Sequence, residues 1–186
     1  LFAPTFSPSL TAAPALFDEI TRLSREKDWQ WLVKFHPKMD PVWIEKYRSI
    51  SSDKLLVIDD CDVSHVLQAG DVMVSDTSSI IGEFALLGKP AVTLNNSQPG
   101  DYLIDINDAS QLESSIEQAL SPSEKFSGQI RGYAQELHPY DDGESAKRIY
   151  EATQQLLENG KKAPKKMPFN LFRNLKMRKK LGYWTL

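Results

Sequence analysis

Short apolar runs alternate with longer amphipathic stretches along most of the chain. The apolar runs lie at residues 1–5, 29–36, 54–59, 71–75, 90–94 and 101–106. The amphipathic stretches lie at residues 13–27, 41–49, 63–70, 78–88, 109–120, 123–137 and 144–158. In the first of them, Leu16, Ile20 and Leu23 recur at the spacing of one helix face. The pattern therefore predicts strands that alternate with helices.

The predicted strands are largely apolar rather than apolar at every second position. This is typical of a parallel sheet that helices cover on both faces, so the sequence predicts an α/β fold with a doubly wound parallel sheet. In such sheets, ligands bind outside the carboxyl ends of the strands. We therefore expect a functional site in the loops that follow Phe35, Ser75 and Leu94.

Length and composition favour one domain with appendages. The chain has 186 residues, of which 41% are hydrophobic, and this is enough for one substantial core. The longest aliphatic runs, such as residues 55–58, are far shorter than the ~20 residues that span a bilayer. The first residues include neither a starting methionine nor the basic segment of a signal peptide. We interpret the sequence as part of a longer protein that begins at a strand.

The single cysteine and the few histidines restrict metal and redox chemistry. Cys61 has no second cysteine to pair with, which favours a reducing compartment and a buried or incidental thiol. No spacing of cysteine, histidine and aspartate is typical of a zinc site, and no glycine-rich loop is typical of a P-loop. The sequence predicts neither a metal nor a cofactor.

Charge is distributed unevenly along the chain. Nine of the 22 basic residues lie after Asn159, where no acidic residue occurs, so 13 basic residues face 25 acidic ones in the rest of the chain. Aromatic and aliphatic residues are interleaved with the basic ones, which suits an anionic membrane surface contacted by residues 161–180. A solvated, partly disordered tail is the alternative. Nucleic acid is not expected as a partner, because the acidic body has no basic face.

The segment Asp76-Thr77-Ser78-Ser79 follows the predicted strand 71–75 and opens the next helix. Free backbone N–H groups and hydroxyls at a helix start suit a phosphate oxygen. Asp76 would repel a phosphate, so we expect it to orient the turn instead. Glu83 lies seven residues after Asp76 and could accept hydrogen bonds from a ribose diol. The alternative is that these residues only cap the helix.

A second group of candidates is Lys34-Phe35-His36-Pro37. Strand alternation would place Lys34 and His36 on one side, with Pro37 ending the strand at its carboxyl edge. Such a pair can neutralise phosphate charge, and His36 can also hydrogen-bond the leaving oxygen, which makes it the catalytic candidate. Considered alone, a histidine before a proline is more often structural.

Asp142 and Gly143 are secondary candidates together with Asp76. They lie in the segment HPYDDGESAKRIY at residues 138–150, just before a predicted helix. A helix cap is the simplest interpretation of Asp142. The functional interpretation is a second helix start that faces the same cleft.

Four segments resemble motifs of the CDP-glycerol glycerophosphotransferase family. DVMVSDTSSIIGEFALLGKP is similar to the family's segment D-v-l-[IV]-[ST]-D-Y-S-S-x-x-x-[DE]-x-x-x-x-x-K-P, and KFHP to its R-x-H-P motif. LFAPTF is similar to the opening A-P-T-W, and DDGESAKRI to the terminal D-G-x-x-x-x-R. The resemblance implies the C-terminal, Rossmann-like half of a GT-B fold. It implies a nucleotide-donor-binding domain at residues 1–158, and residues 159–186 then form the basic, partly apolar tail.

The resemblance also implies an activity in the synthesis of cell-surface polymers. An acceptor hydroxyl on a polymer or lipid-linked acceptor would attack the glycerol-bearing phosphorus of CDP-glycerol and release CMP, at the inner face of the cell membrane. The diphosphate would be held without metal by His36, Ser78 and Ser79, with Lys34 in place of the family's arginine. Glu83 would bind the ribose. The general base would belong to a missing upstream half, so this chain alone would bind the donor without turning it over.

Several positions depart from the family pattern and keep alternatives open. Thr77, counted with the phosphate-binding residues, stands where the family has tyrosine, and Phe6 stands where the opening has tryptophan. The run AVTLNNSQPG reads more like a segment of the non-hydrolysing UDP-N-acetylglucosamine 2-epimerases. An epimerase of that kind or a UDP-sugar glycosyltransferase of GT-B fold is the first alternative. The second, from another class, is a non-catalytic nucleotide-binding module.

Overall fold

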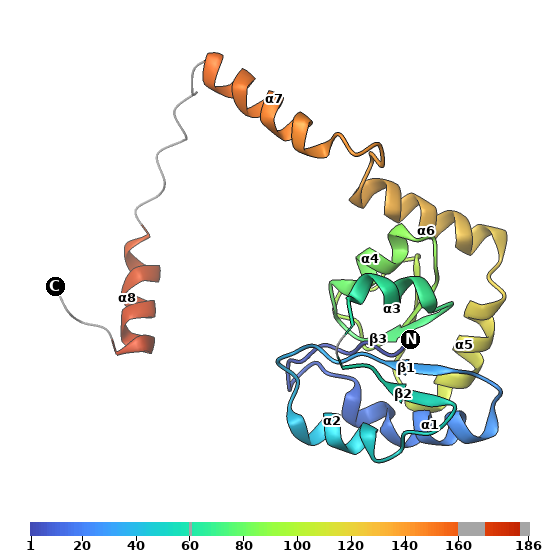
Figure 1. Ribbon diagram of the computed structural model, residues 1–186. Coiled ribbons are helices and arrows are strands. Elements are labelled where there is room, and N and C mark those ends of the chain that lie inside the picture. Colours follow the sequence, from blue (N-terminus) through green and yellow to red (C-terminus); the bar gives the residue numbers. More distant parts are fainter. Residues whose placement is uncertain (60, 160–169, 183–186) are drawn as a thin grey trace. The chain divides into compact units, whose positions relative to one another are not determined.

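The computed structural model describes residues 1–59, 61–159 and 170–182. Its contacts divide the chain into two compact units, Leu1–Pro139 and Tyr140–Leu186. The strands of the first unit are β1 (Trp31–Val33), β2 (Leu55–Val57), β3 (Met73–Ser75), β4 (Ala91–Leu94) and β5 (Leu103–Ile106). Its helices are α1 (Ala13–Glu26), α2 (Pro41–Arg48), α3 (Val63–Ala69), α4 (Ile80–Leu86), α5 (Leu112–Leu120) and α6 (Glu124–Leu137), with a 3₁₀ turn at Ala109–Gln111. The second unit contains α7 (Ser145–Glu158) and α8 (Leu171–Leu181) (Figure 1).

The first residues of the chain join the strands into one parallel sheet. β1 pairs with β2, and β4 pairs with both β3 and β5, all in parallel. Phe2 forms parallel bridges to Val33 of β1 and Val74 of β3. The N–H groups of Phe2 and Ala3 donate to the carbonyls of Leu32 and Val74 at 2.7 and 3.0 Å. The strand order is therefore β2, β1, residues 1–3, β3, β4, β5.

This order places the start of the chain at the centre of the sheet. The chain first winds outward through β1 and β2 and then, from β3, in the opposite direction. The direction reverses between residues 1–3 and β3, which is the switch point of a doubly wound sheet. Ligands bind at such a point, outside the carboxyl ends of the strands. The loops that follow Ala3 and Ser75 therefore surround the expected binding position.

Helices cover both faces of this sheet (Figure 1). Neighbouring strand residues point to opposite faces. Phe2 and Val92 accordingly join one apolar core with α1, α2 and α5, whereas Met73 and Ala91 join another with α3 and α4. α6 packs against α4 through Phe126. The fully apolar strands are thus explained by burial on both sides, as the sequence pattern predicts.

Several helices begin at residues suited to start them. Pro14 lies in the first turn of α1, where its missing N–H leaves no hydrogen bond unmade. Asp40 accepts from the Val42 N–H at 3.0 Å before α2, and Asp62 accepts from the Ser64 N–H at 2.9 Å before α3. These caps fix where the helices leave the loops at the carboxyl edge of β1 and β2.

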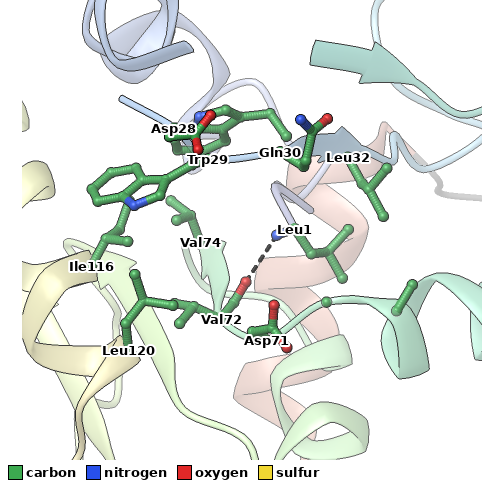
Figure 2. A pocket seen from close by; sticks show the side chains of 13 residues that line it. Leu1, Asp28, Trp29, Gln30, Leu32, Asp71, Val72, Val74, Ile116 and Leu120 are labelled. Carbon is green, nitrogen blue, oxygen red and sulfur yellow. Dashed lines mark hydrogen bonds between the residues drawn. The ribbon is translucent and has the colours of Figure 1, made fainter. Parts of the chain in front are cut away.

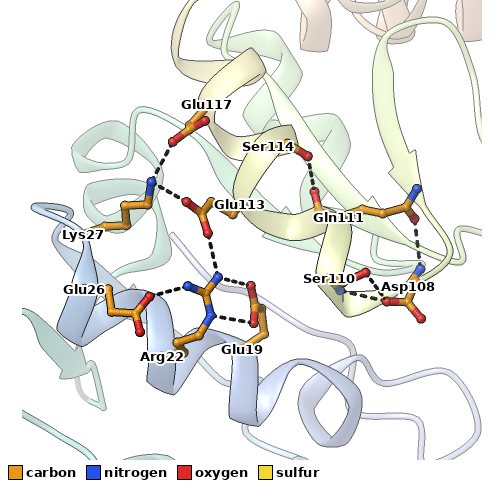
Figure 3. A network of polar contacts seen from close by, with 10 residues as sticks. All are labelled: Glu19, Arg22, Glu26, Lys27, Asp108, Ser110, Gln111, Glu113, Ser114 and Glu117. Carbon is orange, nitrogen blue, oxygen red and sulfur yellow. Dashed lines mark hydrogen bonds and ion pairs between the residues drawn. The ribbon is translucent and has the colours of Figure 1, made fainter.

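Ion pairs connect α1 to α5 (Figure 3). Arg22 contacts Glu19 within α1 and Glu113 of α5, each at 2.6 Å, and Lys27 contacts Glu117 at 2.8 Å. Arg22 and then Lys27 lower the pKa of the Glu113 carboxyl. Exposed pairs of this kind each contribute little to stability, so the network mainly orients α5 against α1.

The elements differ from the sequence prediction mainly at their ends. The strand expected at residues 29–36 covers only Trp31–Val33, so Lys34 and His36 lie in a loop. The helix expected at residues 78–88 begins at Ile80, after both serines. Cys61 is exposed, so of the two expectations for its thiol, buried or incidental, the structure contradicts the first and leaves the second open. The first compact unit ends at Pro139. A donor-binding domain at residues 1–158 stays a prediction.

The two helices of the second unit each expose apolar side chains. Ile149 and Leu156 of α7 are 69% and 61% exposed, and Phe172 of α8 is 86% exposed. No residue of either helix is buried. Among the described residues, no helix combines the length and the apolar character needed to cross a bilayer.

Candidate functional site

Asp76 connects the two loops at the switch point. Its buried carboxylate accepts from the Thr5 N–H at 3.0 Å and from the Ala12 N–H at 2.8 Å. These bonds attach the loop that follows residues 1–3 to the carboxyl end of β3. Burial raises the pKa of Asp76 more than the hydrogen bonds lower it. The carboxylate is therefore engaged by the protein's own N–H groups, which agrees with a residue that orients the turn.

Ser78 and Ser79 follow at the start of α4. Ser79 is the N-cap, but its hydroxyl accepts no capping hydrogen bond. Within the described ranges, neither serine hydroxyl has a hydrogen-bond partner, and both side chains reach a pocket. The capping interpretation therefore does not account for these two hydroxyls. They are available to a ligand.

The pocket beside the serines has a volume of about 310 Å³. Its lining comes from the β3–α4 turn, α4, the loop between β4 and β5, and α6, namely Thr77, Ser78, Ser79, Ile81, Gly82, Asn96, Ser97, Gln98, Tyr102 and Tyr133. Asn96 joins the two loops by donating from its amide to the Asp76 carbonyl at 2.7 Å. The Thr77 hydroxyl accepts from the Ser97 N–H at 2.9 Å. The sequence predicts a functional site in the loops after β3 and β4, and these two loops line one cavity together.

His36 is exposed in the loop after β1 and stacks on Phe6, with 4.4 Å between the ring centroids and an angle of 29° between the ring planes. Its Nδ1 accepts from the Lys38 N–H at 3.0 Å. In the neutral ring this leaves the proton on Nε2, which can donate to a ligand. Because Phe6 lies in the loop that Asp76 anchors, the stack connects His36 to the carboxyl end of β3 through two direct contacts.

Lys34 is directed differently from the sequence expectation. Its ammonium donates to the Asp59 carbonyl at 2.6 Å, in the loop after β2. Binding a phosphate beside Ser78 would require Lys34 to leave that carbonyl. The cation near His36 is instead Lys38, whose ammonium lies 5.7 Å from the centroid of the Phe6 ring. Phosphate binding by Lys34 stays a prediction.

Glu83 lies in the first turn of α4 and is exposed. It does not line the 310 Å³ pocket, which α4 contacts through Ile81 and Gly82. An exposed carboxylate one turn from Ser79 is free to meet a diol. Ribose binding by Glu83 stays a prediction.

Asp142 and Gly143 belong to the second unit. Asp142 accepts from the Arg148 guanidinium at 2.8 Å and from the Glu144 N–H at 3.1 Å. Arg148 lowers the pKa of the Asp142 carboxyl well below its usual range. Gly143 has φ +75°, a conformation that favours glycine. These contacts shape the turn before α7, whose N-cap is Glu144 rather than Asp142. A ligand role for either residue stays a prediction.

A second pocket, of about 360 Å³, opens at the opposite edge of the sheet (Figure 2). Asp28, Trp29, Val72 and Leu120 are among its lining residues, and the amino group of Leu1 donates to the Val72 carbonyl at 2.8 Å. It lies at the amino ends of the strands. Doubly wound sheets bind their ligands at the other edge, so this pocket is not the candidate site.

The described residues contain no group of three or more histidine, cysteine, aspartate or glutamate side chains that could hold a metal ion. The chemistry of the candidate site is that of hydroxyls, one imidazole and amides. Such groups can bind and polarise a phosphate through hydrogen bonds.

Sequence reasoning missed Phe6, Asn96 and the tyrosines at positions 102 and 133 as members of the site. The loop after Leu94 was expected to face ligand, but none of its residues was singled out. Phe6 could have been found from the position it shares with the family's tryptophan. Tyr133 lies on α6, far along the chain from the motifs, and no local signal indicates it.

Comparison with known proteins decides the family. Residues 1–155 match the family described as CDP-glycerol:poly(glycerophosphate) glycerophosphotransferase. The chain belongs to this glycerophosphotransferase family. The match covers most of the chain and agrees with the resemblance drawn from the four motifs. Among curated proteins, none matches the glycerophosphotransferase chain.

Solved structures show the fold of the glycerophosphotransferase chain. A protein described as a UDP-N-acetylglucosamine 2-epimerase from Listeria monocytogenes is 17% identical, with a TM-score of 0.56 over 86% of this chain and 46% of that one. The wall teichoic acid polymerase TagF is 14% identical, with a TM-score of 0.55 over 85% of this chain and 43% of that one. A TagF variant soaked with CDPG gives 16% identity and a TM-score of 0.52 over 85% of this chain and 42% of that one.

The chain thus spans less than half the length of each of these proteins. At such low identity, the similarity concerns the fold alone. It confirms the predicted α/β class with a parallel sheet, similar to part of GT-B proteins.

Proposed function

We propose that this chain binds the nucleotide donor CDP-glycerol for the transfer of glycerol phosphate to an acceptor hydroxyl, with release of CMP. The observation that carries the proposal is the pair of hydroxyls of Ser78 and Ser79, which have no hydrogen-bond partner among the described residues and lie at the carboxyl edge beside the switch point. Family membership supports a transferase of this type. The work of the protein is to position the diphosphate and stabilise its charge.

The residues divide the task by their chemistry. Ser78 and Ser79 donate to oxygens of the diphosphate, and the Nε2–H of His36 donates to the oxygen that leaves with CMP. The acceptor oxygen forms a bond to the glycerol-bearing phosphorus while the bond from that phosphorus to the CMP oxygen breaks. The acceptor's proton passes to a general base from another part of the protein. His36 is catalytic because it touches the leaving oxygen.

In this proposal, the nucleoside lies toward Glu83, beyond the serines that hold the diphosphate. Glu83 accepts from the ribose hydroxyls, because it is an exposed carboxylate one turn beyond Ser79. Thr77 supports the phosphate site through its bond to the Ser97 N–H. The acceptor is a polymer or lipid-linked hydroxyl compound, as the family description suggests.

A binding experiment on variants tests this assignment. We expect His36→Ala and the double variant Ser78→Ala/Ser79→Ala each to weaken CDP-glycerol binding by about tenfold or more, the equivalent of ~1.4 kcal/mol. Calorimetric titration measures the dissociation constants. The control is Cys61→Ser, which changes an exposed thiol outside the lining of the 310 Å³ pocket and leaves binding unchanged. Equal affinities in all the variants would show that the site is assigned wrongly.

We also propose that the basic tail attaches the protein to an anionic membrane from the cytoplasmic side. Of the segment 161–180, residues 161–169 lie outside the described part of the chain. Within α8, Arg173, Lys176 and Lys180 recur on one side of the helix at spacings of three and four residues. Apolar side chains are exposed elsewhere on α8, at Leu171, Phe172, Leu175, Met177 and Leu181. A helix with both features suits the headgroup region of a bilayer.

A further inference from the structure

Asp105 places a charge in the otherwise apolar strand β5. β5 lies at the edge of the sheet, where an exposed charged side chain discourages pairing with another chain. That role alone would require no partner for the carboxylate. The carboxylate of Asp105 nevertheless accepts two hydrogen bonds from other parts of the protein, so protection of the edge does not fully explain this residue.

Both hydrogen bonds end on the same oxygen of Asp105. The Thr93 hydroxyl, on the neighbouring strand β4, donates to Oδ1 at 2.7 Å, and the Asn96 N–H donates to the same atom at 2.9 Å. Thr93 is directly paired with Asp105 in the sheet and is buried, so its hydroxyl requires an acceptor within the protein. Asp105 thereby joins β4 to the loop that follows it.

The first residues of this loop depend on β5 for their conformation. Asn95 has φ +51°, in the left-handed region that residues other than glycine seldom adopt. Its N–H donates to the Ile106 carbonyl at 2.8 Å, and the next N–H, that of Asn96, donates to Asp105. Two neighbouring residues of β5 therefore hold two neighbouring residues of the loop and fix the direction in which it leaves β4.

The same loop contacts the β3–α4 turn. Asn96 donates from its side-chain amide to the Asp76 carbonyl at 2.7 Å, and the Ser97 N–H donates to the Thr77 hydroxyl at 2.9 Å. Both contacts lie just before the two serines of the proposed phosphate site. Asp105 is thus connected, through Asn96, to the main chain of the turn that carries those serines.

We propose that Asp105 is a positioning residue of the donor site, which holds the loop after β4 so that Asn96 and Ser97 fix the β3–α4 turn. It acts through hydrogen bonds and not through its charge, because one oxygen accepts both bonds and an amide oxygen can do the same. Asp105 does not line the 310 Å³ pocket, so its effect on a ligand passes through the loop. This inference rests on the proposed function, because CDP-glycerol affinity reports the position of the turn.

Three substitutions separate hydrogen bonding from charge. We expect Asp105→Ala to weaken CDP-glycerol binding by about fivefold, because the loop loses its acceptor. Asp105→Asn removes the charge but keeps an acceptor oxygen, so it binds CDP-glycerol as the unchanged chain does. The matched control is Asp101→Ala, which removes an exposed carboxylate outside the pocket lining and retains binding. Calorimetric titration measures the dissociation constants.

Two further measurements distinguish positioning from a general loss of stability. In an Asn96→Ala background, Asp105→Ala weakens CDP-glycerol binding by less than about twofold, because the side chain that connects the loop to Asp76 is already absent. In the ligand-free chain, amide hydrogen exchange followed by NMR is faster at Asn96 in Asp105→Ala and unchanged in Asp105→Asn, since only the first variant removes the acceptor.

The outcomes separate this inference from the function on which it rests. If the unchanged chain does not bind CDP-glycerol, the proposed function fails, and a role of Asp105 in donor binding fails with it. If the unchanged chain binds and Asp105→Ala binds as tightly as Asp101→Ala does, Asp105 does not position the site. Equal losses in Asp105→Asn and Asp105→Ala would show that the charge matters, and additive losses with Asn96→Ala would show that Asp105 does not act through Asn96. Either result overturns the inference.

Discussion

At the scale of single residues, Phe6 is the side chain that orients His36. The two rings stack at 4.4 Å, while Nδ1 of the imidazole accepts from the Lys38 N–H. Together these contacts hold the Nε2–H in one direction. Phe6 therefore acts as a positioning residue, because it touches the imidazole and not the donor.

Substitution of Phe6 tests this role. We expect Phe6→Ala to weaken CDP-glycerol binding by about fivefold, because the imidazole loses its stacking partner, an interaction of ~0.5–1.5 kcal/mol. Phe6→Trp restores binding, since a larger aromatic ring can stack in the same way. Calorimetric titration of both variants is the measurement. If Phe6 has a purely structural role, Phe6→Trp weakens CDP-glycerol binding as much as Phe6→Ala does. That result would contradict the account.

Asp76 connects the loop that follows residues 1–3 to the carboxyl end of β3. We expect Asp76→Asn to lower the free energy of unfolding by ~1–3 kcal/mol, because an amide cannot accept from all the buried N–H groups that the carboxylate satisfies. Urea denaturation followed by circular dichroism gives the difference. Asp101→Asn, an exposed aspartate in the loop before β5, is the control and leaves stability unchanged. Equal midpoints for the two variants would contradict the role of Asp76.

Sequence reasoning reached the polar turn at residues 76–79 but not the partners of its residues. Asp76 was expected to orient the turn, and the local pattern was sufficient for that, because a carboxylate beside a phosphate would repel it. That its partners are Thr5 and Ala12 depends on which strand lies beside β3. Lys34 shows the same limit. Strand alternation does not predict the direction of the Lys34 side chain, because β1 ends at Val33. The Lys34 ammonium donates to the carbonyl of Asp59 instead.

At the scale of elements, α8 is the helix whose pattern fits a membrane surface. We expect this chain to bind vesicles that contain phosphatidylglycerol, and to bind phosphatidylcholine vesicles much more weakly, because the basic residues of α8 require anionic headgroups. The double variant Phe172→Ser/Leu175→Ser lowers binding by about fivefold or more, since it removes apolar area from the bilayer. Co-sedimentation with vesicles measures both effects.

Asn174→Ser is the matched control for this helix, because it changes a polar residue of α8 and keeps every apolar and basic one. It retains vesicle binding. Equal binding to the two kinds of vesicle, or full binding by the Phe172 and Leu175 double variant, would show that α8 does not attach the protein in this way.

The elements themselves were largely predictable, and their ends were not. Apolar runs in the sequence predict β3 and β4 correctly, because both faces of these strands are buried. The run at residues 29–36 is longer than its strand, since Trp29 and Phe35 pack against the core without pairing in the sheet. Periodicity describes which residues are buried, and pairing depends on the neighbouring strand.

At the scale of the whole molecule, the order of the strands places the site. Alternating strands and helices restrict a parallel sheet to a few arrangements, so the doubly wound order could be expected from the sequence. The cavity could not be expected, because it depends on contacts between distant segments: Asn96 and Thr77 join the β3–α4 turn to the loop after β4, and α6 reaches the cavity by packing on α4. A Cβ at Gly82 would lie 2.9 Å from Leu137 of α6, which shows how closely the two helices approach.

The central claim is that this chain binds CDP-glycerol through hydroxyls and an imidazole, without a metal ion. The most direct measurement is a calorimetric titration with CDP-glycerol and with UDP-N-acetylglucosamine, each with and without EDTA. The account predicts saturable binding of CDP-glycerol that EDTA does not change, and weaker binding of the uridine compound. Preference for UDP-N-acetylglucosamine, loss of binding in EDTA, or no binding of CDP-glycerol would each contradict it.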